Sequence, residues 1–173
     1  SINRVLVQYA HKVRVQVIHD RGFFQAVQAE DKNFHPTCKY DRYHEILRQC
    51  DIALLPLNET EFNSMKSDLK FIECAGHGVA VLASPTVYER SLVDGETGFL
   101  YRSLAEFEEK FARLIDKDEL RRQIANNAYH WVKDNRLLAY HYRQRYEWYL
   151  EMRDRLDELN AALRQRVPQI FGG

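Results

Sequence analysis

The sequence has no excess of either charge and no long apolar run. Its 25 Lys and Arg residues balance 25 Asp and Glu residues, so the formal net charge is zero. Without a basic excess, no general attraction to nucleic acid or to an anionic membrane is expected. No apolar run approaches the roughly 20 residues of a membrane-spanning helix, and the N-terminus lacks the pattern of a signal peptide. These absences predict a soluble, cytoplasmic protein without a transmembrane segment, although a peripheral place at a membrane stays open.

Cysteine is scarce and irregularly spaced. Cys38, Cys50 and Cys74 are odd in number, and no two have the close spacing of paired metal ligands. A disulfide framework and a zinc site are therefore not expected, and free thiols suit a reducing cytoplasm. Cys50 and Cys74 adjoin apolar segments, which predicts that they are small core residues.

An apolar fraction of 45% over 173 residues is typical of a globular protein with its own core. Short β-branched or apolar runs predict strands at 13–18, 34–40, 51–57 and 79–84, and a last short one within 94–101. Apolar residues at helical spacing predict helices at 2–13, 23–29, 42–49, 69–75, 104–115 and 117–135, and a long helical stretch at 137–164.

Alternating strands and helices predict an α/β fold with a small doubly wound parallel sheet. The run DIALLPL at 51–57 is apolar throughout, which is typical of a strand buried on both faces of such a sheet. We expect a Rossmann-like domain at residues 1–135 and a helical C-terminal extension at 136–173. In such sheets, ligands bind beyond the carboxyl ends of the strands.

The segment 58–78 follows that strand and opens a helix. Ser67 is the expected N-cap, with Ser64 as an alternative. Lys66 and Lys70 place two cations at the positive end of the helix, which costs about 0.3–1 kcal/mol each when they are exposed. A bound anion would reverse this effect. Free N–H groups, a serine hydroxyl and two lysines therefore favour a phosphate site.

Glu73 follows Lys70 by one helical turn, so the two residues share a face. A carboxylate there can accept hydrogen bonds from both hydroxyls of a ribose. Equally, the two residues can form a surface ion pair of little energetic value. The spacing leaves both interpretations open. Asp68 is expected to be a helix-start acid that complements the dipole.

Several segments together resemble the C-terminal, donor-binding domain of retaining GT-B glycosyltransferases (glycosyl transferases group 1). They are CDIALLPL at 50–57, SDLKFIECAGHGVAVLAS at 67–84, DGETGFLY at 94–101 and KFARLIDKDELRRQIANNA at 110–128. The resemblance covers roughly residues 13–135 in the family's order and spacing. It implies half of a GT-B fold that binds a nucleoside-diphosphate sugar for hexosyl transfer, as in polysaccharide biosynthesis. The acceptor would be held by another domain of the same polypeptide.

The resemblance also implies roles for single residues. The family carries two glutamates with seven residues between them, and the second matches Glu73, which would contact the donor ribose. Ser67 and Lys70 fit a subgroup with S-x-x-K before that glutamate, which places the backbone of Asp68 and Leu69 at the diphosphate. Transfer in this family is metal-independent, so Lys66, Lys70 and helix N–H groups, and no metal cofactor, would balance the diphosphate charge.

Three further positions are candidate donor-binding residues. Asp20 ends the first strand and is placed to edge the base or sugar pocket, although such residues also make turns. Tyr40, together with Tyr43, is placed to line a base site, and aromatic residues at this spacing also build cores. Glu89 matches a glutamate that the family often carries, and a surface role at a helix start is equally compatible.

The sequence departs from the family in two places. The first glutamate position is occupied by Met65, which affects sugar recognition. The family's domain opens with a strand and a basic loop, whereas a helix is predicted here before Val13. We therefore expect a fragment that is inactive alone and lacks the first strand. Two alternatives stay open: another GT-B enzyme, such as a sugar-nucleotide epimerase or a phosphorylase, and a non-catalytic interaction module. Catalytic residues are not assigned.

The predicted helical stretch 137–164 is dense in tyrosine and arginine. Such mixtures occur on surfaces that bind nucleic acid or lipid. Here five acidic residues neutralise the face, so a packed amphipathic helix is expected: Glu147, Glu151, Asp154, Asp157 and Glu158. In the resembled family this helix crosses back onto the partner domain. In an isolated chain, its apolar stripe favours homodimerisation.

Overall fold

The computed structural model describes residues 2–171 and divides the chain into two compact units. The first unit extends to Asn135 and the second begins at Arg136. None of the helices in the described range is both long and apolar enough to cross a lipid bilayer. The two units are described separately below.

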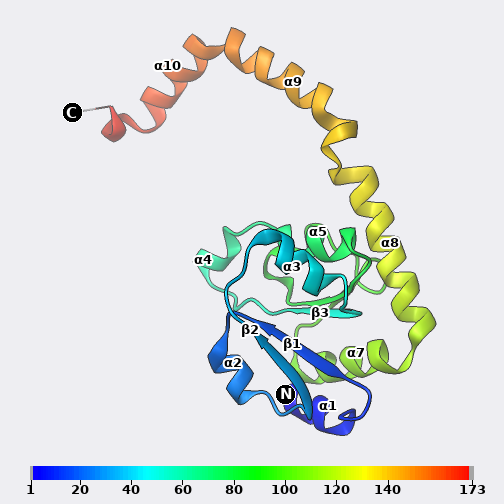
Figure 1. The fold of residues 1–173 in the computed structure, drawn as a ribbon. Helices are drawn as coiled ribbons and strands as arrows, with labels where there is room; N and C mark the ends of the chain where they lie inside the picture. Colours follow the sequence, from blue (N-terminus) through cyan, green and yellow to red (C-terminus); the bar gives the residue numbers. More distant parts are fainter. Residues whose placement is uncertain (1, 172–173) are drawn as a thin grey trace. The chain divides into compact units, whose positions relative to one another are not determined.

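The first unit consists of parallel strands and the helices that connect them (Figure 1). The strands are β1 (Arg14–Ile18), β2 (Asp31–His35), β3 (Ile52–Leu55), β4 (Ala80–Ala83) and β5 (Phe99–Leu100). The helices are α1 (Ile2–Gln8), α2 (Arg21–Ala26), α3 (Tyr40–Leu47), α4 (Glu61–Ser64), α5 (Leu69–Gly76), α6 (Pro85–Tyr88), α7 (Leu104–Asp116) and α8 (Asp118–Arg136), the last of which ends one residue past the boundary. The predicted α/β fold with parallel strands is confirmed.

The strands form two hydrogen-bonded sheets. β1 pairs with β2, and β4 lies between β3 and β5. Every one of these pairings is parallel. Among the described residues, no strand pairs with the second edge of β1 or of β3. The single sheet that was predicted is therefore divided between β1 and β3.

Helices cover both faces of the strands, which confirms the doubly wound arrangement. In Figure 1, α1 and α7 lie on one side, and α3 and α5 lie on the other. β4 contributes side chains to the core on both faces of the sheet. Ala80 and Leu82 pack in the cluster with α1 and α7. Val81 and Ala83 pack in the cluster with α5. The alternation follows from the two-residue period of a strand. The core therefore lies on both sides of β4.

One prediction about burial is wrong. β3 was expected to be buried on both faces, and all four of its residues are only partly buried. The neighbouring β4 is fully buried. The difference has a topological reason, since β4 has a strand on each side and β3 has only one. The apolar run predicts the strand correctly but does not predict which edge is covered.

Several element bounds differ from the predictions. β2 begins at Asp31 rather than Phe34, because its first residues are polar and give no strand signal. The short helices α4 and α6 have four residues each and were not predicted. The expected burial of Cys74 is confirmed, whereas Cys50 is partly buried.

The second unit contains three helical segments: α9 (Leu138–Asp154), α10 (Leu156–Arg166) and the 3-10 turn η1 (Pro168–Ile170). The single long helix that was predicted is thus broken at Arg155, whose side chain pairs with Glu151 and Glu158. Neither α9 nor α10 has a buried residue. Five aromatic side chains of α9 are exposed: Tyr140, Tyr142, Tyr146, Trp148 and Tyr149.

Candidate functional site

The loops that follow β3 and β4 are tied to each other. The backbone N–H of Leu57 donates to the hydroxyl of Ser84 at 2.8 Å, and the hydroxyl of Thr86 donates to the carbonyl of Leu57 at 3.0 Å. The Ser91 hydroxyl donates to the carboxylate of Asp68. These bonds fix the start of α5 at the carboxyl ends of two parallel strands, where α/β folds bind ligands.

The expected N-cap of α5 is wrong by one residue. Asp68, rather than Ser67 or Ser64, is the N-cap, and its side chain makes no capping bond to its own helix. That carboxylate is bound by Ser91 instead. The Asp68 side chain therefore does not cap the first turn of α5, and the Phe71 N–H in that turn donates to the Asp68 carbonyl at 2.9 Å. Ser64 belongs to α4, whose N-cap is Thr60.

The basic residues of the segment are exposed. Lys66 lies in the loop before α5, with its ammonium 5.0 Å from the ring centroid of Phe62. Ser67 and Leu69 are exposed beside it. Met65, at the first family glutamate position, is also exposed, as the C-cap residue of α4. Lys66, Ser67 and Leu69 therefore line the surface at the start of α5.

Glu73 lies at the centre of the polar contacts on α5. Its side chain is only 5% exposed and pairs with Lys70, with 2.9 Å between Nζ and Oε2. Tyr43 also donates to Oε2, at 3.1 Å, and Tyr40 donates to Oε1 at 3.2 Å. The Lys70 ammonium lies 4.2 Å from the ring centroid of Tyr43. The pair is therefore more than a surface ion pair, because its carboxylate is buried and bound by side chains from α3.

These contacts set the ionisation of the cluster. Burial acts to raise the pKa of Glu73, but the hydrogen bond and charge of Lys70 and the two tyrosine hydroxyls outweigh it and lower the pKa below 4.5. Glu73 is therefore a carboxylate at neutral pH. Burial, followed by the charge of Glu73, raises the pKa of both Tyr40 and Tyr43, so both hydroxyls remain donors.

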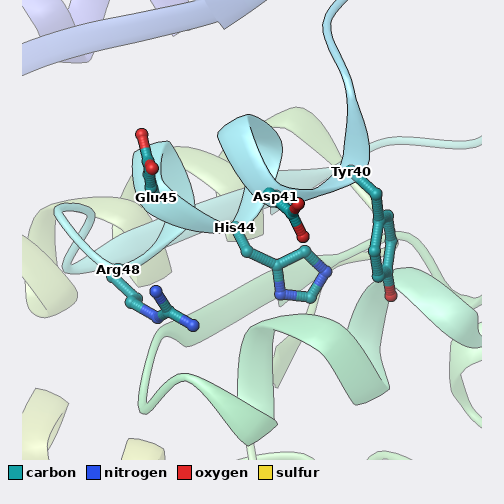
Figure 2. A pocket seen from close by; sticks show the side chains of 5 residues that line it. All are labelled: Tyr40, Asp41, His44, Glu45 and Arg48. Carbon is teal, nitrogen blue, oxygen red and sulfur yellow. The ribbon is translucent and has the colours of Figure 1, made fainter.

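A pocket of about 350 Å³ lies along α3 next to this cluster. Figure 2 shows its lining side chains, which come from α3 and its C-cap residue Arg48: Tyr40, Asp41, His44, Glu45 and Arg48. Nδ1 of His44 lies 2.5 Å from Nε2 of His77, the C-cap residue of α5. Burial, and then the neighbouring His44, lowers the pKa of His77. Nε2 of His44 is buried and has no hydrogen-bond partner among residues 2–171.

The sequence-based interpretation missed His44 and the role of Tyr43. Tyr40 was assigned to the predicted strand at 34–40 and His44 to the predicted helix at 42–49, whereas both lie on α3, one turn apart. The partner residues on α5 were not predictable from spacing, because 33 positions separate His44 from His77. Only the packing of α3 against α5 brings them together.

Two other candidates lie outside this cluster. Asp20 is the N-cap of α2 and accepts a hydrogen bond of 2.8 Å from the N–H of Phe23. Glu89 is the C-cap residue of α6 and pairs with Arg102 at 2.7 Å. Within residues 2–171, no hydrogen bond or ion pair joins either one to Glu73. Asp20 thus begins a helix, and Glu89 lies at a helix end rather than at the helix start of the alternative interpretation.

The described part of the chain holds no group of three or more His, Cys, Asp or Glu side chains arranged to bind a metal ion. The charged group that contacts Glu73 is the Lys70 ammonium, and the acidic residue at the start of α5, Asp68, is bound by Ser91. What the cluster offers a ligand is one carboxylate, two tyrosine hydroxyls, exposed ammonium groups and helix N–H groups.

Sequence comparison connects this arrangement to a family. The sequence model of the glycosyl transferase-like family matches residues 4–167. The chain belongs to this family. This match confirms the resemblance to glycosyl transferases group 1. A search of curated protein sequences found no match to the glycosyl transferase-like chain.

Solved structures that share the fold of the glycosyl transferase-like chain include the two that follow. One is the C-terminal domain of LpcC, a glycosyl transferase group 1 family protein from Francisella tularensis, with 22% identity and a TM-score of 0.54 over 67% of this chain and 59% of that one. The other is the pneumococcal O-GlcNAc transferase GtfA in complex with UDP and GlcNAc, with 17% identity and a TM-score of 0.56 over 76% of this chain and 28% of that one. The match thus covers about three fifths of the solved LpcC domain and less than one third of the GtfA chain.

Proposed function

We propose that this chain binds the nucleoside-diphosphate sugar donor of a glycosyltransferase, which passes the hexosyl group to an acceptor held by another domain. The observation that carries this proposal is the buried Glu73 carboxylate, which is ionised and lies one turn from the exposed Lys70. A buried carboxylate provides two acceptor oxygens for the hydroxyls of a ribose. The helix start beside it provides a positive surface for a diphosphate. Membership of the glycosyl transferase-like family supports the same class of ligand.

The diphosphate is expected at the start of α5. The side chains of Lys66 and Lys70 and the hydroxyl of Ser67 would balance and bind its oxygens. The backbone N–H groups of Asp68 and Leu69 would donate to them, as at other helix N-termini. No metal ion is required in this scheme, because the ammonium groups supply the positive charge. Transfer with retention of configuration is part of the proposal.

The base is expected beside Tyr40, a residue that is 62% exposed and lies next to the proposed ribose site. The pocket along α3 continues from Tyr40 to Arg48 and is large enough for a nucleobase. Asp20 and Glu89 are weaker parts of this proposal, since each is engaged in a local contact.

The open edges of β1 and β3 can each pair with a further strand. β3 is apolar along its whole length yet half-exposed, and its free edge lacks a hydrogen-bonding strand among the described residues. Such an edge is a template for another strand. We propose that a further strand of the same polypeptide pairs there and that the chain alone has no transferase activity. Homodimerisation through the exposed aromatic residues of α9 remains a prediction.

Calorimetric titration tests the proposal. The full chain is titrated with UDP, GDP and their sugars, first without added metal and then with EDTA. We expect one nucleoside diphosphate to bind, with unchanged affinity in EDTA, and Glu73→Gln to abolish binding. The matched control is Glu109→Gln on the surface of α7. If no nucleotide binds, the donor-binding proposal is wrong for this chain, and a non-catalytic module becomes the better interpretation.

A further inference from the structure

The oxygens of Glu73 are unequally occupied. Within the described residues, Oε2 accepts two hydrogen bonds, one from Lys70 and one from Tyr43, whereas Oε1 accepts one, from Tyr40. An ionised carboxylate has about two acceptor positions on each oxygen. Oε2 is therefore filled, and Oε1 retains one free position. A ribose that donates one hydroxyl to each oxygen needs a donor to leave Oε2.

The two donors on Oε2 differ in their freedom to move. The ring of Tyr43 is partly buried and packs against the α5 side of the core, under the Lys70 ammonium. The side chain of Lys70 is 52% exposed and lies in the first turn of α5. A lysine side chain is flexible, and its ammonium follows the nearest negative charge. Lys70 is therefore the donor that leaves Oε2 at the lower cost.

We propose that Lys70 couples the phosphate and ribose parts of the donor site by moving its ammonium from Glu73 to the diphosphate. The move vacates the acceptor position on Oε2 that a ribose hydroxyl then takes. No bond is formed or broken beyond hydrogen bonds, and no proton is transferred. This inference rests on the proposed function, and it adds that the site selects nucleoside diphosphates over nucleosides because the phosphate exposes the ribose acceptor.

The inference predicts opposite effects of one substitution on two ligands. In Lys70→Met, the aliphatic stem remains on Tyr43 while the ammonium is lost. The nucleoside diphosphate should bind about tenfold more weakly, because a charge-assisted contact is lost. The nucleoside alone should bind about threefold or more tightly than it does to the wild type, because Oε2 is already free. A residue that only supports the fold would weaken both ligands.

The experiment is a calorimetric titration with uridine or guanosine, chosen to match the diphosphate that binds, with and without inorganic pyrophosphate. In the wild type, pyrophosphate should tighten nucleoside binding, and Lys70→Met should abolish this effect. Lys70→Arg should retain it. Lys66→Met serves as the charge control: it should weaken diphosphate binding without tightening nucleoside binding, because Lys66 does not contact Glu73 in the described chain.

A direct readout distinguishes movement from general damage. Pyrophosphate alone should shift the ¹³C resonance of the Glu73 carboxyl in the wild type and leave it unmoved in Lys70→Met. If a nucleoside diphosphate binds but Lys70→Met weakens both ligands equally, the coupling is wrong and the proposed function stands. If no nucleoside diphosphate binds the wild type, both are overturned.

Discussion

The hydroxyl of Tyr43 donates to Oε2 of Glu73 at 3.1 Å and joins α3 to α5. The bond is formed between a partly buried tyrosine and a carboxylate that is almost fully buried. A buried carboxylate depends on such donors, because water no longer solvates it. The arrangement therefore has consequences for stability as well as for ligand binding.

Removing the Tyr43 hydroxyl should destabilise the chain. Tyr43→Phe leaves Glu73 with one donor fewer, which costs about 1.5–3 kcal/mol for a bond to a charged group. Tyr40→Phe should cost less, because Tyr40 is exposed and water can replace its hydroxyl. Urea unfolding of the two variants measures the difference. Equal free energies of unfolding would contradict the role of burial.

The contribution of Glu73 should disappear in acid. Its pKa is lowered in the folded chain, so the stabilisation is complete above the unfolded value near 4.5 and is lost as the pH falls through the folded value. Thermal unfolding of the wild type and of Glu73→Gln should therefore differ most near neutral pH and converge below pH 4.5. Glu119→Gln, at an exposed carboxylate on α8, is the control and should show no such convergence.

Phe71 should be a major contributor to the core. It is fully buried on α5, and its ring centroid lies 5.8 Å from that of Trp131 on α8. Phe71→Ala should cost about 3–5 kcal/mol, through lost burial and the cavity that remains. Phe62→Ala, at an exposed position of α4, should change the free energy of unfolding little. Chemical denaturation that found the two variants equally stable would argue against the packing described.

Two glycines should respond to alanine with opposite signs. A Cβ at Gly98 would lie 2.5 Å from the side chain of Leu92 and 3.1 Å from the carbonyl oxygen of Val81. Gly98→Ala should therefore destabilise the chain by about 1–3 kcal/mol. A Cβ at Gly76, the last residue of α5, would meet no atom within 4 Å. Gly76→Ala should therefore stabilise the folded chain by about 0.4–1 kcal/mol. Thermal unfolding should give a lower melting temperature for Gly98→Ala and a higher one for Gly76→Ala than for the wild type.

Amide exchange should distinguish β4 from the strands with open edges. β4 pairs on both sides and is fully buried, so its N–H groups should exchange only when the unit unfolds. On β1 and β3, the N–H groups that face the open edges should exchange much faster than those that face β2 and β4. Uniform slow exchange along β3 would mean that its free edge is covered in solution, for example by a second copy of the chain.

The sequence by itself determined the fold class and the general place of the site. Short continuous apolar runs such as the one ending at Leu57 are typical of strands, and helical spacing between such runs is typical of crossovers, so the α/β arrangement follows from local pattern. Lys70 and Glu73 are one turn apart on a helix, so their shared face was also fixed locally. The ordered segments were sufficient to identify the family.

Tertiary structure decided what the local pattern leaves open. Sequence separation hides the contacts between α3 and α5, so neither the tyrosine donors on Glu73 nor the His44–His77 pair was predictable. The N-cap of α5 is Asp68, whose carboxylate is bound by Ser91, 23 residues later, and not by its own helix. The half-exposure of β3 likewise depends on which strand lies beside it. Local periodicity determines which elements form, whereas long-range packing decides which side chains they bring together.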